Sequence, residues 1–317
     1  MTERFSRFFL VAILGMTFAQ ILNAQTWAER LGFPSDTKVI ILHADDVGMC
    51  SEANEAATAQ LQSGAIQSAS VMVPCPAFEE MADWASKNPD YCVGLHLTLT
   101  SEWQTHRWSP VMPENLVKGL VDDGGKMWHS VKQVVENASA ETVEREIRAQ
   151  IETAMRAGIV PSHIDTHMGT LYANNDYTEI YFRLAEEYEI PAMVIDFANQ
   201  EVVTKFRKQG YPITDRLIKM VDEYKLPKLD YFTSVGAAET YDMKKQKFME
   251  QIKELPHGLS EIIFHPSTES DHLKTITNAW QQRVWEAKLF SDPEIIEFLK
   301  EEQIVFTNWK EVMQRFK

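Results

Sequence analysis

The segment Val39-Ile40-Ile41-Leu42-His43-Ala44-Asp45-Asp46-Val47-Gly48 joins an apolar run directly to two adjacent acids. An uncharged run rich in β-branched side chains is typical of a strand buried on both faces. Neighbouring carboxylates repel each other, so this pair favours a shared cation or proton. A turn at Gly48 can direct both acids into one cleft. The alternative is a helix N-cap with an acidic first turn, because a helical pattern begins near Ser51.

Two other apolar runs carry a histidine. The run 93–99 contains His96, and the run 261–264 is followed directly by His265. A lone histidine among apolar residues is more often a hydrogen-bonded core residue than a ligand, so neither run alone predicts a site. With the acidic pair, however, they bring reactive side chains to three strand-like segments of one chain.

The most specific pattern is His163-Ile164-Asp165-Thr166-His167. In an extended strand alternate residues share a face, so His163, Asp165 and His167 are expected to project together. This combination supplies imidazole ligands and a carboxylate that can hold an imidazole in one tautomer. The pattern therefore indicates a metal site.

Strand-like and helix-like segments alternate from residue 38 onward. The predicted strands are 38–43, 66–73, 91–99, 162–167, 192–195, 229–232, 261–264 and 304–307. The helical patterns lie near 51–62, 77–87, 141–157, 176–189, 199–223, 242–253, 279–300 and 308–316. Eight such units predict an α/β fold, an irregular TIM-like (β/α) barrel in a single domain, whose strand ends would gather the acids and histidines. A doubly wound open sheet is the alternative, but no glycine-rich phosphate loop follows the first strand.

The first 24 residues differ from the rest of the chain. Arg4 and Arg7 precede the apolar run 8–14, and small or polar residues end the segment at Ala24. This layout predicts a signal peptide at 1–24, cleaved near Ala24, and an exported, periplasmic protein. A retained membrane anchor is the alternative, but the apolar stretch is short. The domain is then expected to occupy 25–317.

The charge balance limits the partners. The chain has 31 basic and 46 acidic residues, a net charge of −15. This balance argues against nucleic acid or an anionic membrane surface and fits a neutral or cationic small molecule or glycan. The three cysteines, Cys50, Cys75 and Cys92, have no metal-type spacing and are expected to be small buried side chains.

One predicted connection, at about 100–140, is unusually long. Long loops within a compact domain are often functional. This loop contains Trp103, Trp108 and Trp128, and exposed aromatic rings commonly stack on sugar faces. The alternative is that these rings pack the loop against the barrel, since tryptophan is usually well buried.

The chain resembles the YdjC-like (ChbG-type) carbohydrate deacetylases. The motifs that carry the resemblance are Ala44-Asp45-Asp46-Val47-Gly48, Gly94-Leu95-His96-Leu97-Thr98-Leu99-Thr100, His163-Ile164-Asp165-Thr166-His167 and Phe264-His265-Pro266. The segment 280–286, with Arg283, matches more loosely. The resemblance implies removal of N-acetyl groups from a chitooligosaccharide-like substrate, with acetate as the product.

By position, the resemblance implies one divalent cation held by Asp46, His96 and His167. Asp45 would be the general base and His265 the general acid. These roles agree with the chemistry of the side chains, because a cation with three protein ligands keeps room for water and substrate. One carboxylate and two imidazoles suit Zn²⁺ by ligand softness, whereas members of the family are usually described with Mg²⁺, so both are expected candidates.

Other residues are expected to surround this centre. His163 and Asp165 would contact the ligands or the substrate, as would Arg283 and the loop residues Trp103 and Trp108. The chain departs from the family in having His43 where asparagine is common, and Gly169 where a further histidine is common. The alternatives to a deacetylase are a glycan-binding protein with a vestigial metal site and another metallohydrolase on the same barrel.

Overall fold

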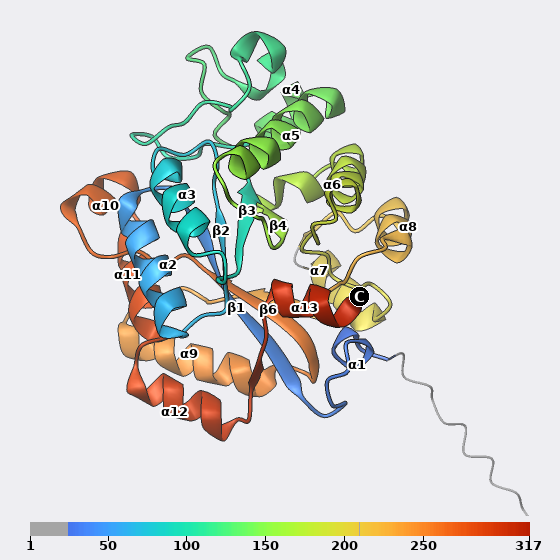
Figure 1. Cartoon of the computed structure of the whole chain (residues 1–317), viewed down its shortest axis with the longest axis vertical. Coiled ribbons are helices and arrows are strands. Elements are labelled where there is room, and N and C mark those ends of the chain that lie inside the picture. Colours follow the sequence, from blue (N-terminus) through green and yellow to red (C-terminus); the bar gives the residue numbers. More distant parts are fainter. Residues whose placement is uncertain (1–24, 209) are drawn as a thin grey trace, which may run out of the picture.

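Parallel strands form one curved sheet at the centre of the computed structural model (Figure 1). The structure describes residues 25–208 and 210–317, and within them the chain forms seven strands. They are β1 (Lys38–Val47), β2 (Ser68–Val71), β3 (Val93–Leu97), β4 (Ile164–Thr166), β5 (Tyr231–Ser234), β6 (Gly258–Phe264) and β7 (Val305–Phe306). Their order is β4-β3-β2-β1-β6-β5, with β7 also paired to β1. Strands that follow one another in the chain are neighbours from β1 to β4, and β5 is the neighbour of β6, as in a barrel. The strand order does not reverse as it does in a doubly wound sheet.

The α/β fold with a parallel sheet is confirmed, but the described residues form a half-barrel and not a closed eight-stranded barrel. The predicted strand 192–195 forms only isolated bridges, from Ala192 to Ile164 of β4 and from Ile195 to Leu229. Pro191 offers no backbone N–H at the start of this segment, which shortens the ladder that it can form. The segment therefore spans the gap between β4 and β5 without becoming a regular strand.

The two faces of the sheet differ because side chains alternate along each strand. In β1, Ile40 and Leu42 face outward into the main hydrophobic core under the helices. Val39 and Ile41 face inward into a second apolar cluster. The same inward alternation continues to Asp45, so the inner face becomes polar toward the strand ends.

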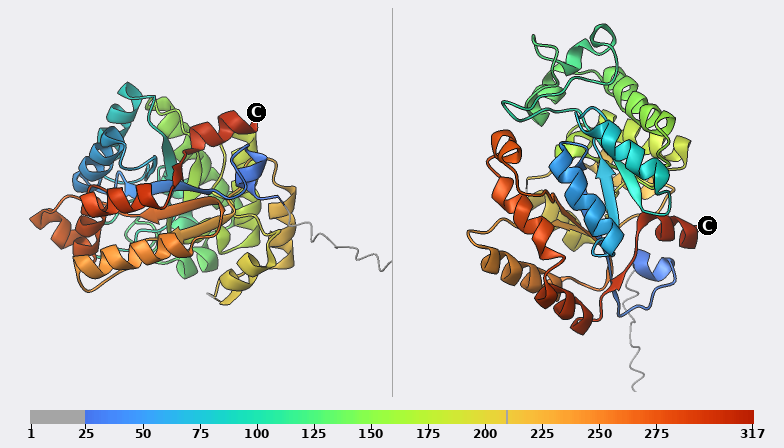
Figure 2. Two further views of the ribbon diagram at one scale, coloured as in Figure 1. Left: turned by 90° about the horizontal axis from the view of Figure 1, so that it is seen from below. Right: turned by 60° about the vertical axis from the view of Figure 1, so that its left-hand side comes forward.

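The apolar cluster on the inner face closes the end of the sheet where the strands begin. It contains Trp27 from α1 (Trp27–Arg30) and Trp309 from α13 (Trp309–Phe316), together with Leu259. These two helices lie side by side in Figures 1 and 2, and the rings of Trp27 and Phe316 are 6.3 Å apart. With this end filled, the polar inner face is open at the opposite end, where the strands finish.

Helices cover the outside of the sheet. Within the described ranges the remaining α-helices are α2 (Ser51–Ser63), α3 (Phe78–Lys87), α4 (Val131–Asn137), α5 (Ala140–Arg156), α6 (Asn175–Tyr188), α7 (Gln200–Lys208), α8 (Asp215–Glu223), α9 (Tyr241–Glu254), α10 (Asp271–Ile276), α11 (Trp280–Leu289) and α12 (Pro293–Glu301). The helical patterns 199–223 and 279–300 are each divided in two. The first break contains Gly210 at φ 88°, and the second has Asp292 capping α12 with Pro293 at its first position.

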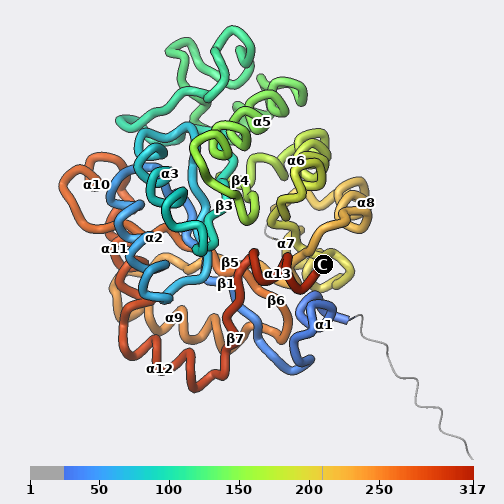
Figure 3. Tube along the Cα trace, in the orientation of Figure 1, coloured from blue at the N-terminus to red at the C-terminus, as the bar shows by residue number. Residues whose placement is uncertain are grey.

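The long connection after β3 is folded onto the molecule and not extended. It contains the short helices η1 (Glu114–Leu116), η2 (Lys118–Leu120) and α4, and it projects beyond the sheet in Figure 3. The buried Glu146 carboxylate of α5 accepts hydrogen bonds from the backbone of Val111 and Met112 at 2.9 and 3.0 Å. This anchor fixes the middle of the connection to the helix layer.

The predicted signal peptide at 1–24 lies outside the residues that the structure describes. In the described part of the chain, no helix is both long enough and apolar enough to cross a bilayer. Cys50, Cys75 and Cys92 are free and buried there, as expected for small buried side chains.

Candidate metal centre

The adjacent acids reach one cavity through a local change in the backbone of β1. Asp45 faces inward by normal alternation, and Asp46 should then face outward. Asp46 instead has a left-handed φ of 58°, and the pairing register between β1 and β2 shifts between Ala44 and Val47. Gly48 follows at φ 87°, where an added Cβ would lie 2.8 Å from a methyl group of Val71. Both carboxylates therefore line the cavity, and neither caps α2, whose N-cap is Cys50.

The cavity opens where the strands end and has a volume of about 450 Å³. This volume is within the range of roughly 300–1,000 Å³ that is typical of small-molecule sites. The predicted site residues that line the cavity are Asp45, Asp46, His96, Asp165, His167, His265 and Arg283. They come from β1, β3, β4, the segments directly after β4 and β6, and helix α11, so the fold brings together residues more than 200 positions apart.

Three donor atoms meet at the floor of this cavity. Asp46 Oδ1 lies 3.4 Å from His96 Nε2 and 3.1 Å from His167 Nδ1. The two nitrogens are 3.2 Å apart. A cation about 2.0–2.2 Å from each of three such ligands holds them about 2.8–3.6 Å apart. The geometry of the three side chains therefore fits one divalent cation.

A second observation supports this fit. Within the described part of the chain, the buried Asp46 Oδ1 receives no hydrogen bond of good geometry, although His167 Nδ1 lies 3.1 Å from it. Its other oxygen, Oδ2, accepts one from Arg283 at 2.6 Å. A buried carboxylate oxygen without a partner is costly unless something else neutralises it. A cation between the three donors would supply that interaction.

Each histidine of the trio has a carboxylate on its other ring nitrogen. His96 Nδ1 lies 2.5 Å from Asp165 Oδ1, and His167 Nε2 lies 3.0 Å from Glu102 Oε2. Such carboxylates orient metal-ligating imidazoles and raise their basicity. Glu102 was not singled out as a site residue from the sequence. It lies in the long connection, 65 positions before His167, and its spacing gives no signal.

The pKa values of these groups describe the protein without a cation. Burial raises the pKa of Asp46, but Arg283 and the nearby imidazoles outweigh burial and hold it well below its usual value. Burial lowers the pKa of His167, whereas Glu102 and Asp46 raise it, to about 9 overall. The metal-free site therefore holds protons on imidazole, and a cation that binds there must displace them.

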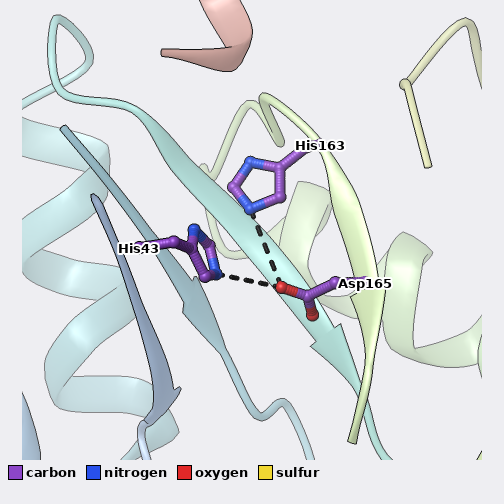
Figure 4. Close-up of side chains that lie close together, drawn as sticks. All are labelled: His43, His163 and Asp165. Carbon is purple, nitrogen blue, oxygen red and sulfur yellow. Dashed lines mark ion pairs between the residues drawn. The ribbon is translucent and has the colours of Figure 1, made fainter. Parts of the chain in front are cut away.

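His43 links the acidic pair to the orienting carboxylate of β4. Its Nε2 lies 2.9 Å from Asp45 Oδ1 and 3.0 Å from Asp165 Oδ2. Figure 4 shows the imidazoles of His43 and His163 pointing at Asp165 from two sides. Burial lowers the pKa of His43, but Glu261 and the two aspartates raise it well above its usual value. A protonated His43 therefore places one positive charge between Asp45 and Asp165, both of which face its Nε2–H.

The structure does not bring every expected residue to the cavity. In the lining formed by the described residues, His163, Trp103 and Trp108 are absent. His163 is fully buried, 5.7 Å from Trp309 in a stacked arrangement. Trp108 is only 2% exposed and donates its Nε1–H to Thr100 O at 2.9 Å. Both rings therefore support the site from behind.

Trp103 is half-buried beside Arg283. The guanidinium lies over the indole at 5.5 Å from its centre, and Trp103 packs edge to face with Trp108 at 5.4 Å. This cation–π contact holds Arg283 where it can pair with Asp46. The tryptophan pair thus connects the long loop to the floor of the cavity.

His265 lies on the cavity wall after β6, and its side chain is 35% exposed. Its backbone N–H donates to Glu286 Oε2 at 2.7 Å. Glu286 Oε1 pairs with the fully buried Lys244 at 2.8 Å. A buried ion pair thus fixes the backbone of His265 while its imidazole remains accessible to a ligand.

Comparisons with known proteins agree with this geometry. Residues 39–301 match the family described as YdjC-like protein. A carbohydrate deacetylase of Thermus thermophilus is 29% identical over 273 residues, covering 86% of this chain and 93% of the relative. A carbohydrate deacetylase of Thermoanaerobacter pseudethanolicus is 24% identical over 272 residues, with coverages of 86% and 98%. A crystal structure from Enterococcus faecalis, of a protein named for cellobiose-phosphate cleavage, has the same fold with a TM-score of 0.72 and 22% identity, over 87% of this chain and 99% of that one. The chain belongs to the YdjC-like family.

Proposed function

We propose that this chain is a metal-dependent carbohydrate deacetylase, which hydrolyses the N-acetyl group of an acetylated amino sugar or chitooligosaccharide-like substrate and releases acetate. The observation that carries the proposal is the trio Asp46, His96 and His167 on the floor of a cavity that also presents Asp45 and His265. Relatives named carbohydrate deacetylase, aligned over most of their length, support the same activity.

The trio would hold one divalent cation, Zn²⁺ or Mg²⁺. When bound, such an ion supplies Lewis-acid polarisation of an amide carbonyl and lowers the pKa of a coordinated water. Two imidazoles and one carboxylate favour Zn²⁺ by ligand softness. Mg²⁺ prefers more oxygen ligands, which water and substrate would have to provide.

Asp45 is the general base of the proposed reaction. A water molecule adds to the acetamide carbonyl carbon, and Asp45 takes the proton that the water loses. His43 holds this carboxylate through the contact at 2.9 Å. Arg283 pairs with the other acid, Asp46, at 2.6 Å, so the two adjacent acids have different partners and different tasks.

His265 is the proposed general acid. Breaking the C–N bond leaves the electron pair on the sugar nitrogen, which needs a proton to depart as an amine. The imidazole of His265 is on the cavity wall and is accessible. Its backbone is anchored by Glu286, so the ring is held at the site. The products are acetate and a free amino sugar.

Acetate release from N,N′-diacetylchitobiose tests this proposal, with Zn²⁺, with Mg²⁺ and with a chelator. We expect metal-dependent release in equal amounts with new free amine. Asp45→Asn should reduce kcat by about 10²–10⁴-fold, the usual contribution of a general base. Asp123→Asn, on the exposed part of the long connection, is the matched control and should behave like wild type.

Two outcomes would refute the proposal. One is the absence of metal-dependent acetate release from a panel of acetylated sugars by protein shown to contain metal. The other is unchanged activity in Asp45→Asn. Glycan binding that survives metal removal, without turnover, would instead favour the binding-protein alternative.

We also propose that the protein is exported to the periplasm. Arg4 and Arg7, the apolar run 8–14 and the small residues ending at Ala24 support this localisation. N-terminal sequencing of the mature protein from a Gram-negative host should start near residue 25. A mature protein that retains Met1 would contradict the proposal.

A further inference from the structure

One side of the cavity is apolar. The apolar part of the lining comes from the chain between β4 and β5, including α7 and α8, and from β5, and it includes Ile195, Phe197, Phe206, Ile213, Leu217 and Phe232. We refer to these six side chains as the apolar wall. None of these six side chains can hydrogen-bond a sugar hydroxyl that loses its water on binding, so this part of the lining suits an apolar group of the ligand.

The same cavity also leaves large apolar side chains in contact with solvent. Met168 is 49% exposed and Tyr211 is 47% exposed, and both line the cavity. Gly169 also lines the cavity, and an added Cβ there would meet nothing within 4 Å among the described atoms. The space beside the candidate metal centre is thus open and bordered by apolar surface, which is typical of a ligand site and not of a filled core.

The fixed charges that line the cavity disfavour an anionic group on the ligand. Five carboxylates line it, from Asp45, Asp46, Glu102, Asp165 and Glu261. Among the described lining residues, the one permanent cation is Arg283; its Nη2 pairs with Asp46 at 2.6 Å, and its buried Nη1 has no hydrogen-bond partner. Recognition of a phosphate normally requires free arginine or lysine donors. A sugar phosphate placed away from the metal trio would meet these carboxylates, with a single arginine to offset them.

We propose that the substrate class of this site is an uncharged N-acylated amino sugar that carries an apolar substituent, with the sugar amide on the polar floor and the substituent on the apolar wall. This inference rests on the proposed deacetylase function. The apolar group can be an alkyl or aryl aglycone or a longer acyl chain on the amide nitrogen, since both present the same surface.

Binding of a graded ligand series to the full chain tests the inference without requiring turnover. Isothermal titration of the metal-free protein uses the methyl, butyl and hexyl β-glycosides of N-acetylglucosamine. A second arm uses methyl glucosaminides with N-acetyl, N-butanoyl and N-hexanoyl groups, which separates the two sources of the apolar group. Each fully buried CH₂ contributes about 0.8 kcal/mol, or about fourfold in affinity. We expect the dissociation constant to fall at least tenfold from the shortest to the longest ligand in one arm.

Variants connect the gain in affinity to the apolar wall. Ile213→Ser and Phe232→Ser should each reduce the logarithm of the affinity gain with chain length to less than half of its wild-type value. Ile296→Ser, at a 40% exposed position of α12 outside the cavity, is the matched control and should keep the full gain. Circular dichroism and the unfolding temperature verify that each variant is folded.

Three results would overturn the inference. The first is a gain in affinity below twofold from the shortest to the longest ligand in both arms. The second is an unchanged gain in both wall variants. The third is tighter binding of the 6-phosphate ester of the methyl glycoside than of the methyl glycoside itself. The proposed function is tested separately from this inference. If acetate is not released but affinity still rises with chain length, the deacetylase assignment is refuted and the apolar subsite remains. If the methyl glycoside is deacetylated but affinity does not rise with chain length, only the inference about substrate class is refuted.

Discussion

The substitution Glu102→Gln tests how the long connection supports the candidate metal centre. Glu102 Oε2 lies 3.0 Å from His167 Nε2. Among the described residues, this is the only hydrogen bond between the long connection and a ring nitrogen of a proposed metal ligand. Loss of a carboxylate behind a metal-bound imidazole typically lowers metal affinity by about 10–100-fold, or about 1.4–2.7 kcal/mol. The Glu102 side chain is 24% exposed, so water can partly replace it, and we expect about a tenfold loss, at the low end.

Calorimetric titration of Zn²⁺ into the metal-free protein measures this effect. The pKa of His167 is about 9 without a cation, because Glu102 and Asp46 outweigh the effect of burial. Binding at pH 7 must therefore release a proton, and titration in two buffers of different ionisation enthalpy counts it. We expect fewer protons released by Glu102→Gln, because the pKa of His167 falls when the negative charge is removed.

The control is Glu114→Gln, an exposed glutamate of the same connection. It should leave both the dissociation constant and the proton count as in wild type. If Glu102→Gln also binds Zn²⁺ within twofold of wild type and releases the same number of protons, the orienting role of Glu102 is refuted.

Three further predictions concern stability, each measured by urea unfolding. Gly94→Ala should cost about 3 kcal/mol, because an added Cβ would lie 2.3 Å from the His163 ring. Lys244→Met should cost about 3–5 kcal/mol, because it leaves the Glu286 carboxylate, now 2.8 Å from Lys244 Nζ, buried without a counter-charge; a loss below 1 kcal/mol would contradict this. Burial raises the pKa of Glu52, but hydrogen bonds from the start of α10 lower it to about 2 overall. The contribution of the Glu52 carboxylate to the free energy of unfolding is therefore complete above pH 4.5 and is lost as the pH falls toward 2. The stability difference between wild type and Glu52→Gln should therefore shrink between pH 6 and pH 3, and a difference that grows would contradict the cause.

The candidate site could be anticipated because its residues sit at strand ends. Periodicity places Asp45 and Asp165 on the inner face, and a parallel sheet gathers the ends of its strands at one edge. The structure brings Asp46, His96 and His167 together within hydrogen-bonding distances, as the family resemblance implied. Whether they bind a cation stays a prediction.

Other features depend on contacts that local pattern does not encode. The left-handed backbone at Asp46 accompanies the shift in pairing register between β1 and β2, which the alternation of side chains along a strand does not predict. The contact of Glu102 with His167 depends on how a long loop folds back. The burial of Trp108 depends on the same loop, so the sequence allowed both an exposed and a packed ring. The half-barrel replaces the expected closed barrel because the segment 192–195 forms only isolated bridges.

The central claim is the division of labour between the two adjacent acids, with Asp46 as a metal ligand and Asp45 as the base. The metal content of purified wild type, Asp45→Asn and Asp46→Asn, measured by plasma mass spectrometry after dialysis against Zn²⁺ and then metal-free buffer, tests it most directly. We predict about one ion per chain in wild type and in Asp45→Asn, and almost none in Asp46→Asn. Full metal content in Asp46→Asn, or its loss in both variants alike, would contradict the claim.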